Sequence, residues 1–446
     1  MNGIRRSCLV GNEDAVQRVI AEIDAMRDDI LGTLSTAVQI PSITPKYPGL
    51  SYEELVGGET RCNESLRPTY EAAGATIDQW EEEPERANLV GVVKGSGGGR
   101  SLIFNGHIDT VPPGDPTTWK WGDPWSGRIE DGKLYGLGST DMKAGVVAQA
   151  KAAEALRRAG VQLKGDLIIE SVVGEETMDH ERGVTATVRR GYHADAAIVT
   201  EPTGLPSPST LAPCSVGTYW LRITVPGKAT HVLVRGNLIW PGGEGEEFGV
   251  NAIDKGFFVY QAMSKLEANW GFTKSHPLYR PGHFNLGVNL IVGRPPGPMV
   301  PFIVPNECVL DYIVIFPPDD DPQAVQQEII DYLNLVFDQD PWLKKHRPTL
   351  EWVHHWPAYD TPTDHPICQT VDRAHANVLG VPATFQGFPA VDDATYLERG
   401  GIPSISFGPG NVMMAHAVNE YVICDEVINA CKIYAATAID WCGFAD

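Results

Sequence analysis

The sequence contains no apolar run that approaches the roughly 20 residues needed by a membrane-spanning helix. It also lacks the pattern of a secretory signal, because the apolar stretch at residues 8–11 is too short and runs directly into acidic residues at 13 and 14. These two absences predict a cytoplasmic protein that does not enter membranes.

Cysteine is sparse, with eight residues scattered along the 446-residue chain and no C-x-x-C pair. A disulfide framework or a paired-cysteine metal site is therefore not expected, and the thiols are predicted to be reduced. A single cysteine nucleophile is the alternative. No cysteine stands in a glycine-rich or histidine-flanked context, so the structural interpretation is favoured.

Basic residues are also in deficit, with 35 Lys and Arg against 57 Asp and Glu, for a formal net charge of −22. An acidic surface repels phosphate backbones and anionic lipid, so neither nucleic acid nor membrane is an expected partner. What the chain does have is a globular composition, 43% hydrophobic and 21% charged. Its length suggests about two or three domains.

The first part of the chain alternates helical and strand-like segments. Residues 14–37 carry apolar positions at helical spacing, and an alanine-rich helix is predicted over 141–160. Short β-like runs occur at 88–93, 101–104, 166–173 and 194–199. Strands that alternate with helices favour an α/β fold with a mainly parallel sheet and helices on both faces.

The rhythm changes near residue 214. A strand at 218–225, a helix at 250–268, two strands at 284–292 and 308–316, a helix at 321–337 and a strand at 349–355 give a β-α-β-β-α-β order. After about residue 360 the α/β pattern resumes. We therefore expect a catalytic domain formed by 1–213 and 359–446, interrupted by an inserted α+β domain at 214–358.

Polar side chains with metal-ligand chemistry follow several strands of the first domain. His107, Asp141, the pair Glu175 and Glu176, Glu201 and His416 all stand just beyond a strand or its following turn. Sites in open α/β sheets form outside the carboxyl ends of the strands, so these residues are expected to share one crevice. Imidazole and carboxylate are the usual ligands of zinc and related divalent ions.

Each of these residues has an ordinary interpretation when taken alone. Histidine after a strand is usually a surface residue, adjacent glutamates usually form a solvated face, and Asp141 could simply cap a helix. The joint placement favours a metal site. The segment Gly-His-Ile-Asp-Thr at 106–110 adds support, because Asp109 could bind the second ring nitrogen of His107.

With these motifs, the chain resembles the dizinc hydrolase family of acetylornithine deacetylase, succinyl-diaminopimelate desuccinylase, aminoacylases and glutamate-releasing carboxypeptidases. The matching segments are in order between about 80 and 425: GHIDTVP at 106–112, the run 125–143 ending in GSTDMK, GEE at 174–176, TEPT at 200–203, GKATH at 227–231, and FGPG at 407–410 with AHAVNEY at 415–421. The resemblance implies a zinc-peptidase-like catalytic domain and an inserted lid or dimerisation domain.

The resemblance also implies a role for each ligand. His107 and Glu201 would bind one divalent ion, and Glu176 and His416 would bind the other. Asp141 would bridge the two ions. Zinc is the expected metal, with manganese or cobalt as alternatives.

Three further residues take catalytic roles by the same resemblance. Glu175 would be the general base, Asp109 would orient His107, and His231 of the inserted domain would stabilise the oxyanion. In the family this histidine acts on a neighbouring subunit, so a homodimer or larger homo-oligomer formed through the inserted domain is expected.

The chain departs from the family in the inserted domain. Where relatives commonly carry Asp-x-Arg, this sequence has Asp311-Tyr-Ile, without the arginine. Arg294 could replace it as a ligand for a substrate carboxylate, and an ordinary exposed loop arginine is the alternative. Asn251 is a second candidate substrate-binding residue, and it follows an unusual insertion at 232–248 that could reshape the pocket or the dimer interface.

The sequence thus predicts a two-metal hydrolase of an amide C–N bond in a small substrate, either an N-acyl amino acid deacylase or a dipeptide-type carboxypeptidase. One alternative is a hydrolytic deaminase or amidase of a small aromatic compound on the same fold, for which the missing arginine leaves room. A second alternative, of another class, is a non-catalytic metal-binding or scaffold protein. The complete ligand set and Glu175 argue against the second alternative.

Overall fold

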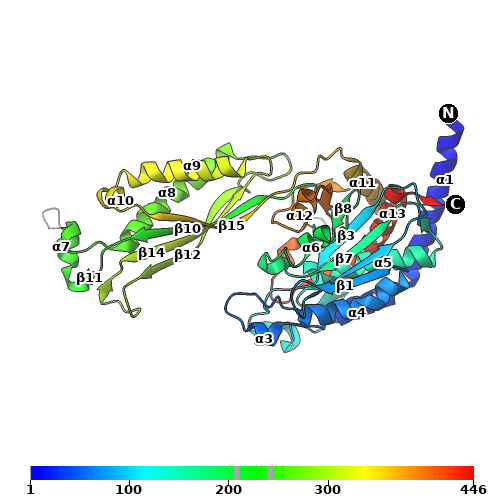
Figure 1. Cartoon of the computed structure of the whole chain (residues 1–446), viewed down its shortest axis with the longest axis horizontal. Helices are drawn as coiled ribbons and strands as arrows, with labels where there is room; N and C mark the ends of the chain where they lie inside the picture. Colours follow the sequence, from blue (N-terminus) through cyan, green and yellow to red (C-terminus); the bar gives the residue numbers. More distant parts are fainter. Residues whose placement is uncertain (1, 205–209, 240–244, 446) are drawn as a thin grey trace. The chain divides into compact units, whose positions relative to one another are not determined.

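The computed structural model describes residues 2–204, 210–239 and 245–445, which divide into two compact units (Figure 1). Unit 1 comprises Met1–Cys214, Thr361–Phe388 and Asp392–Asp446, and unit 2 comprises Ser215–Asp360 and Pro389–Val391. The boundaries expected from the sequence, 213/214 and 358/359, lie close to these divisions. The lid or dimerisation role of unit 2 stays a prediction, and residues 240–244 of the 232–248 insertion lie outside the described residues.

Unit 1 is built on a six-stranded sheet in the order β1-β2-β7-β3-β8-β17. The strands β7, β3, β8 and β17 run parallel to one another, whereas β2 pairs antiparallel with both β1 and β7. The α/β fold class is confirmed, and the sheet is mixed at one edge. The strands are β1 (Thr76–Glu81), β2 (Ala87–Val93), β3 (Leu102–His107), β7 (Leu167–Val172), β8 (Ala197–Val199) and β17 (Ser404–Ser406).

Helices cover both faces of this sheet, as neighbouring residues of β3 demonstrate. Phe104 packs against Tyr434 of α13 (Cys424–Cys442), with ring centroids 5.1 Å apart. The next residue, Asn105, donates to Glu170, which also accepts from Thr187 of α6 (Val184–Arg189). Because successive side chains of a strand point to opposite faces, α13 and α6 lie on opposite sides of the sheet.

The remaining helices of unit 1 include several that differ from the sequence prediction. The helix expected at 14–37 is two helices, α1 (Asn2–Ala25) and α2 (Arg27–Val38), which meet at Met26. Sequence reasoning left α4 (Gly58–Ala72) unassigned; most of its residues are polar, and it contains Pro68. The other long helices are α5 (Ala144–Arg158) and α11 (Pro366–Leu379).

Unit 2 has the predicted β-α-β-β-α-β order. Its four strands form an antiparallel sheet in the order β12-β14-β10-β15, and its two long helices pack on it. In β10, buried positions alternate with partly exposed ones, which is typical of a sheet covered on one face. The elements are β10 (Gly217–Pro226), α8 (Ala252–Thr273), β12 (Asn285–Arg294), β14 (Glu307–Phe316), α9 (Pro322–Phe337) and β15 (Thr349–Trp356).

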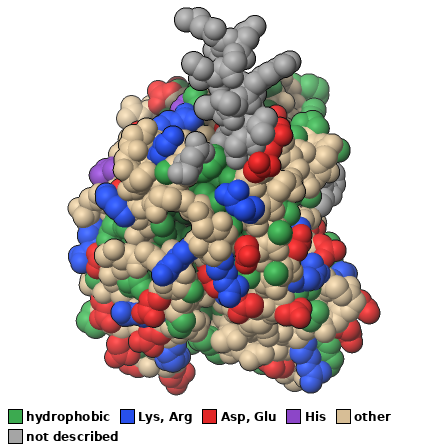
Figure 2. All heavy atoms as spheres, turned by 90° about the vertical axis from the view of Figure 1, so that its right-hand side faces the viewer, with side chains coloured by type: hydrophobic (Ala, Val, Ile, Leu, Met, Phe, Trp, Pro, Cys, Tyr) green, Lys and Arg blue, Asp and Glu red, His purple; other side chains and the backbone are tan. Residues whose placement is uncertain are grey.

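Surface and cysteine chemistry agree with a globular protein of mixed charge. On the face drawn in Figure 2, Lys and Arg side chains are interspersed with Asp and Glu, without one continuous basic patch. The seven cysteines whose side chains are described are free and buried. Across the described part of the chain, no helix combines the length and the apolar character required to cross a membrane.

Candidate active site

His107 is the last residue of β3, and its imidazole is buried at the carboxyl edge of the sheet. A β-carbon at Gly106, the residue before it, would lie 2.8 Å from Met142 in the turn before α5 and from Val146 in α5, so glycine lets these segments pack closely against the strand. The Nε2 atom of His107 lies 3.2 Å from Asp141 Oδ1 and 3.4 Å from Glu201 Oε1.

Asp141 lies between two imidazoles. Its Oδ1 faces His107, and its Oδ2 lies 3.3 Å from Nε2 of His416. The helix predicted from residue 141 begins at Ala144; Asp141 itself lies in a distorted turn, Ser139–Lys143, with extended φ and ψ of −115° and 95°. This backbone turns the carboxylate toward the two histidines, so that each oxygen serves a different one.

His416 and Glu176 complete the second half of the site. The Nε2 of His416 lies 3.0 Å from Glu176 Oε2, and the His416 ring is about half exposed. Glu176 belongs to the short turn Glu175–Thr177, which follows Gly174 at a φ of +85°. Two groups of three result, His107 with Asp141 and Glu201, and His416 with Asp141 and Glu176.

Glu175 lies beside this arrangement without joining it closely. Its Oε2 is 3.9 Å from His107 Nε2, beyond hydrogen-bonding distance. Burial, reinforced by the charges of Glu201 and Glu176, raises the pKa of Glu175 well above its usual value. Glu175 is thus a buried carboxylate that lies close to His107 without a hydrogen bond to its imidazole.

The electrostatics of the site suit a pair of cations. Burial and the neighbouring Asp141 raise the pKa of Glu201 to about 8, and the hydrogen bonds that His416 donates to Asp141 and Glu176 raise its pKa to about 11. These shifts arise because four carboxylates and two imidazoles are packed close together with little water between most of them. Ligand atoms of His107, Asp141 and Glu176 all lie within 4.8 Å of one another, and this donor set fits divalent ions.

Asp109 does not make the contact expected from the sequence. Its carboxylate lies 3.6 Å from His107 Nδ1 and accepts instead the backbone N–H groups of Gly174 (2.9 Å), Glu175 (3.3 Å) and Glu176 (3.1 Å). The Nδ1 atom of His107 is 3.0 Å from the backbone carbonyl oxygen of Asp109. Asp109 therefore faces Nδ1 of His107 with its carbonyl oxygen at hydrogen-bonding distance and with its carboxylate slightly farther away.

Glu420 is a residue of the site that sequence reasoning missed. Its Oε1 accepts the backbone N–H groups of Thr140 (2.7 Å) and Asp141 (3.2 Å), and its side chain is fully buried. Burial and the nearby Asp141 raise the pKa of Glu420 to about 8. The only signal available was its place four residues after His416, inside the segment that matches the family.

The three candidates of the inserted domain belong to unit 2, whereas the residues described above belong to unit 1. His231 ends the short strand β11 (Thr230–His231), and its exposed ring accepts from Leu233 N–H. Asn251 caps α8 by accepting from Ile253 N–H at 2.9 Å. Arg294 is 55% exposed and lies 3.5 Å from Glu307, so Asn251 and Arg294 both have ordinary structural partners.

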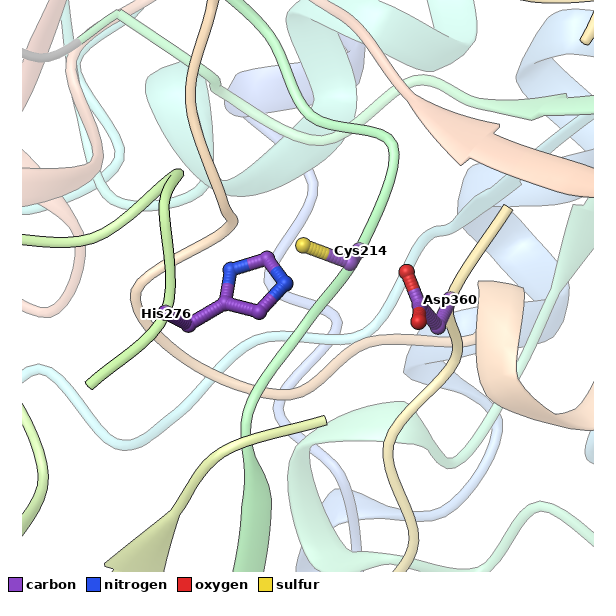
Figure 3. A group of neighbouring side chains, drawn as sticks. All are labelled: Cys214, His276 and Asp360. Carbon is purple, nitrogen blue, oxygen red and sulfur yellow. The ribbon is translucent and has the colours of Figure 1, made fainter. Parts of the chain in front are cut away.

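Figure 3 draws a second group of side chains with ligand chemistry, Cys214, His276 and Asp360. Cys214 ends the first segment of unit 1, whereas His276 and Asp360 belong to unit 2. Burial raises the pKa of Asp360, and the charge of His276 opposes that rise.

The sequence is similar to those of known hydrolases. The sequence model of peptidase family M20/M25/M40 matches residues 103–440. The chain is 30% identical over 438 residues to N-formyl-4-amino-5-aminomethyl-2-methylpyrimidine deformylase of Halalkalibacterium halodurans, covering 96% of this chain and 97% of that protein. It is 34% identical over 381 residues to the deformylase of the same name from Bacillus subtilis, covering 83% and 86%.

Solved structures match the fold over nearly the whole chain. Human carnosine dipeptidase 1 aligns with a TM-score of 0.67 at 16% identity, covering 96% of this chain and 98% of that one. The dipeptidase Dug1p of Saccharomyces cerevisiae aligns with a TM-score of 0.68 at 15% identity, covering 95% and 98%. At these identities the likeness concerns the fold.

Proposed function

Because the chain belongs to peptidase family M20/M25/M40, whose members are metal-dependent hydrolases of C–N bonds, we propose that it is an N-deacylase of a small heteroaromatic amine. The proposed reaction removes a short N-acyl group, with formyl as the preferred group, from the aminomethyl arm of that amine. The observation that carries the hydrolytic part is Asp141, which directs one oxygen to each of two imidazoles. The near full-length similarity to two deformylases supports the substrate class.

The proposed ligands follow the two groups of the site. His107 and Glu201 would hold one divalent ion, Glu176 and His416 the other, and Asp141 both. Zinc is proposed because imidazole and carboxylate oxygens are its usual ligands, with manganese or cobalt as alternatives. When bound, such ions supply Lewis acidity that polarises a carbonyl and acidifies water.

Glu175 is the proposed general base. It lies beside ligand Glu176 on the same turn, and its Oε2 is 3.9 Å from the nearest imidazole nitrogen of His107. It would take a proton from the attacking water and return it to the leaving nitrogen, as a positioned carboxylate near the reacting atoms can do. Asp109 and Glu420 would keep the two ligand turns in place through their bonds to backbone N–H groups.

The contacts of unit 2 support a substrate without a free carboxylate. Asp311 of β14 binds Arg222 of β10 through two hydrogen bonds of 2.8 and 3.0 Å. Arg294, the candidate for holding a substrate carboxylate, lies beside Glu307. These pairings leave room for the amidase of a small aromatic compound, which the similarity to the two deformylases favours over the N-acyl amino acid deacylase and the dipeptide carboxypeptidase.

A matched substrate series tests this proposal. The zinc-loaded enzyme is expected to release formate from an N-formyl-aminomethylpyrimidine with a kcat/KM at least ~100-fold above that for an N-formyl amino acid, because an unpaired carboxylate in the pocket costs several kcal/mol. Comparison with the N-acetyl analogue of the pyrimidine measures selectivity for the acyl group, separately from selectivity for the amine. Faster hydrolysis of an N-acyl amino acid or a dipeptide would contradict the substrate class.

A homodimer is proposed through the edge of the unit 2 sheet. The edge strand β12 carries Leu290 and Ile291 at 46% and 40% exposure, and Phe257 on the adjoining helix α8 is also exposed. An exposed apolar edge strand is a template for pairing with a second copy.

The cytoplasmic location expected from the sequence stays a prediction.

The role of His231 is testable in such a dimer. A His231→Ala variant and a Glu175→Gln variant, each of low activity, are expected to recover activity when mixed and allowed to exchange subunits, because one hybrid site then contains both intact residues. Labelled subunits and native mass spectrometry monitor the exchange. Absence of recovery despite demonstrated exchange would remove His231 from the neighbouring site.

A further inference from the structure

The turn that carries Glu175 and Glu176 is a closed loop. The backbone N–H of Asp179 donates to the carbonyl oxygen of Gly174 at 2.8 Å, which joins the two ends of the segment. Gly174 and Met178 both have positive φ values, +85° and +59°. A non-glycine residue such as Met178 adopts this conformation only where its surroundings enforce it, so the shape of the turn depends on contacts from outside.

One end of the turn is held by Asp109, which accepts the N–H groups of residues 174–176. The other end is held by the Asp179 carboxylate. Its Oδ2 accepts from Arg86 Nη1 at 2.7 Å and from Lys46 Nζ at 2.8 Å. Charge-assisted bonds of this kind are stronger and more directional than neutral ones.

Arg86 is itself fixed. Its side chain is fully buried, and two bonds of 2.6 and 2.8 Å join it to the buried carboxylate of Glu59 on α4. Arg86 Nη1 also donates to Glu83 at 3.1 Å, and Asp109 is a further acidic group that faces its charge. The guanidinium therefore joins α4 and the start of β2 to the turn through a planar fork that cannot rotate freely.

We propose that Arg86 is a positioning residue for hydrolysis, which holds the Gly174–Asp179 turn through Asp179 so that Glu175 and Glu176 keep their places at the site. This inference rests on the proposed role of Glu175 as general base. Misplacing a catalytic group by about 1 Å can cost on the order of 100-fold in rate. Partners behind metal ligands typically contribute 10–100-fold in affinity or activity.

A pair of matched variants separates positioning from general stability. Asp179 and Glu83 both bind Arg86 and Lys46, and their side chains are similarly exposed, at 18% and 21%. Only Asp179 belongs to the turn. Asp179→Ala is expected to lower kcat about 10-fold with little change in KM, whereas Glu83→Ala leaves kcat unchanged, and Asp179→Asn, which retains an acceptor oxygen, recovers part of the loss.

The visible absorption spectrum of the cobalt-substituted protein gives a second readout. Asp179→Ala is expected to alter this spectrum, because ligand Glu176 lies on the same turn, whereas Glu83→Ala is not. Equal effects of the two alanine variants on kcat and spectrum would overturn the positioning role. A normal kcat in Asp179→Ala, together with an inactive Glu175→Gln variant, would also overturn the positioning role. In that case the role of Glu175 as general base would still stand. Full activity in Glu175→Gln would instead overturn the proposed function.

Discussion

Replacing Glu175 with glutamine is expected to lower kcat by at least ~100-fold, the scale of general-base catalysis, while the metal content stays at the wild-type level. The amide has nearly the same shape as the carboxylate but cannot accept the proton of the attacking water. Glu175 lies 3.9 Å from the nearest imidazole nitrogen of His107, so its loss should leave the ligand groups intact. Steady-state kinetics and elemental analysis of the same preparation measure both quantities.

A matched control uses the same substitution at Glu154, a buried glutamate of α5 that binds Lys151. Glu154→Gln should leave kcat unchanged, which separates the loss of a base from the loss of a buried charge. If Glu175→Gln instead loses metal, and its activity returns on adding excess zinc, then Glu175 is a ligand and the assignments of Glu175 and Glu176 have to be exchanged.

Replacing Asp141 with asparagine is expected to abolish the binding of both ions and with it the activity. An amide presents one oxygen where the carboxylate presents two, so asparagine cannot bind the ion beside His107 and the ion beside His416 at the same time. Loss of a direct ligand should weaken metal affinity by more than about 100-fold, because partners behind the ligands alone contribute 10–100-fold.

Thermal denaturation with and without zinc provides the measurement. Wild-type protein should gain stability with zinc, since a ligand that binds the folded state stabilises it, and Asp141→Asn should show little gain. Glu201→Gln and Glu176→Gln each remove a ligand from one group and should retain part of the effect. Two tightly bound ions in Asp141→Asn would show that Asp141 does not bridge them.

The strand-end ligands could be predicted because their signal is local. Apolar runs end at Phe104 and Val199, shortly before His107 and Glu201, and the parallel neighbours β3 and β8 bring those ends together. The family resemblance drawn from the motifs is confirmed by the match over residues 103–440. Asn251, a candidate substrate-binding residue in the sequence, caps α8, a local role that asparagine before a helix commonly takes.

Contacts between distant segments could not be predicted in this way. Asp141 was expected to begin a helix, but Glu420, 279 residues away, binds its backbone N–H. Arg86 carries no motif, and its role depends on Glu59 and Asp179 meeting it from different elements. The nearness of Asp109 to His107 could be predicted from the motif, but the sequence does not reveal which backbone amides bind its carboxylate.

The measurement that tests the central claim most directly is a zinc titration of metal-stripped protein while hydrolysis of an N-formyl-aminomethylpyrimidine is recorded. The arrangement of His107, Asp141, Glu176, Glu201 and His416 predicts that the rate rises from near zero and reaches its plateau at about two ions per chain. A folded protein that stays inert toward this and other amides at saturating zinc, manganese and cobalt would contradict it.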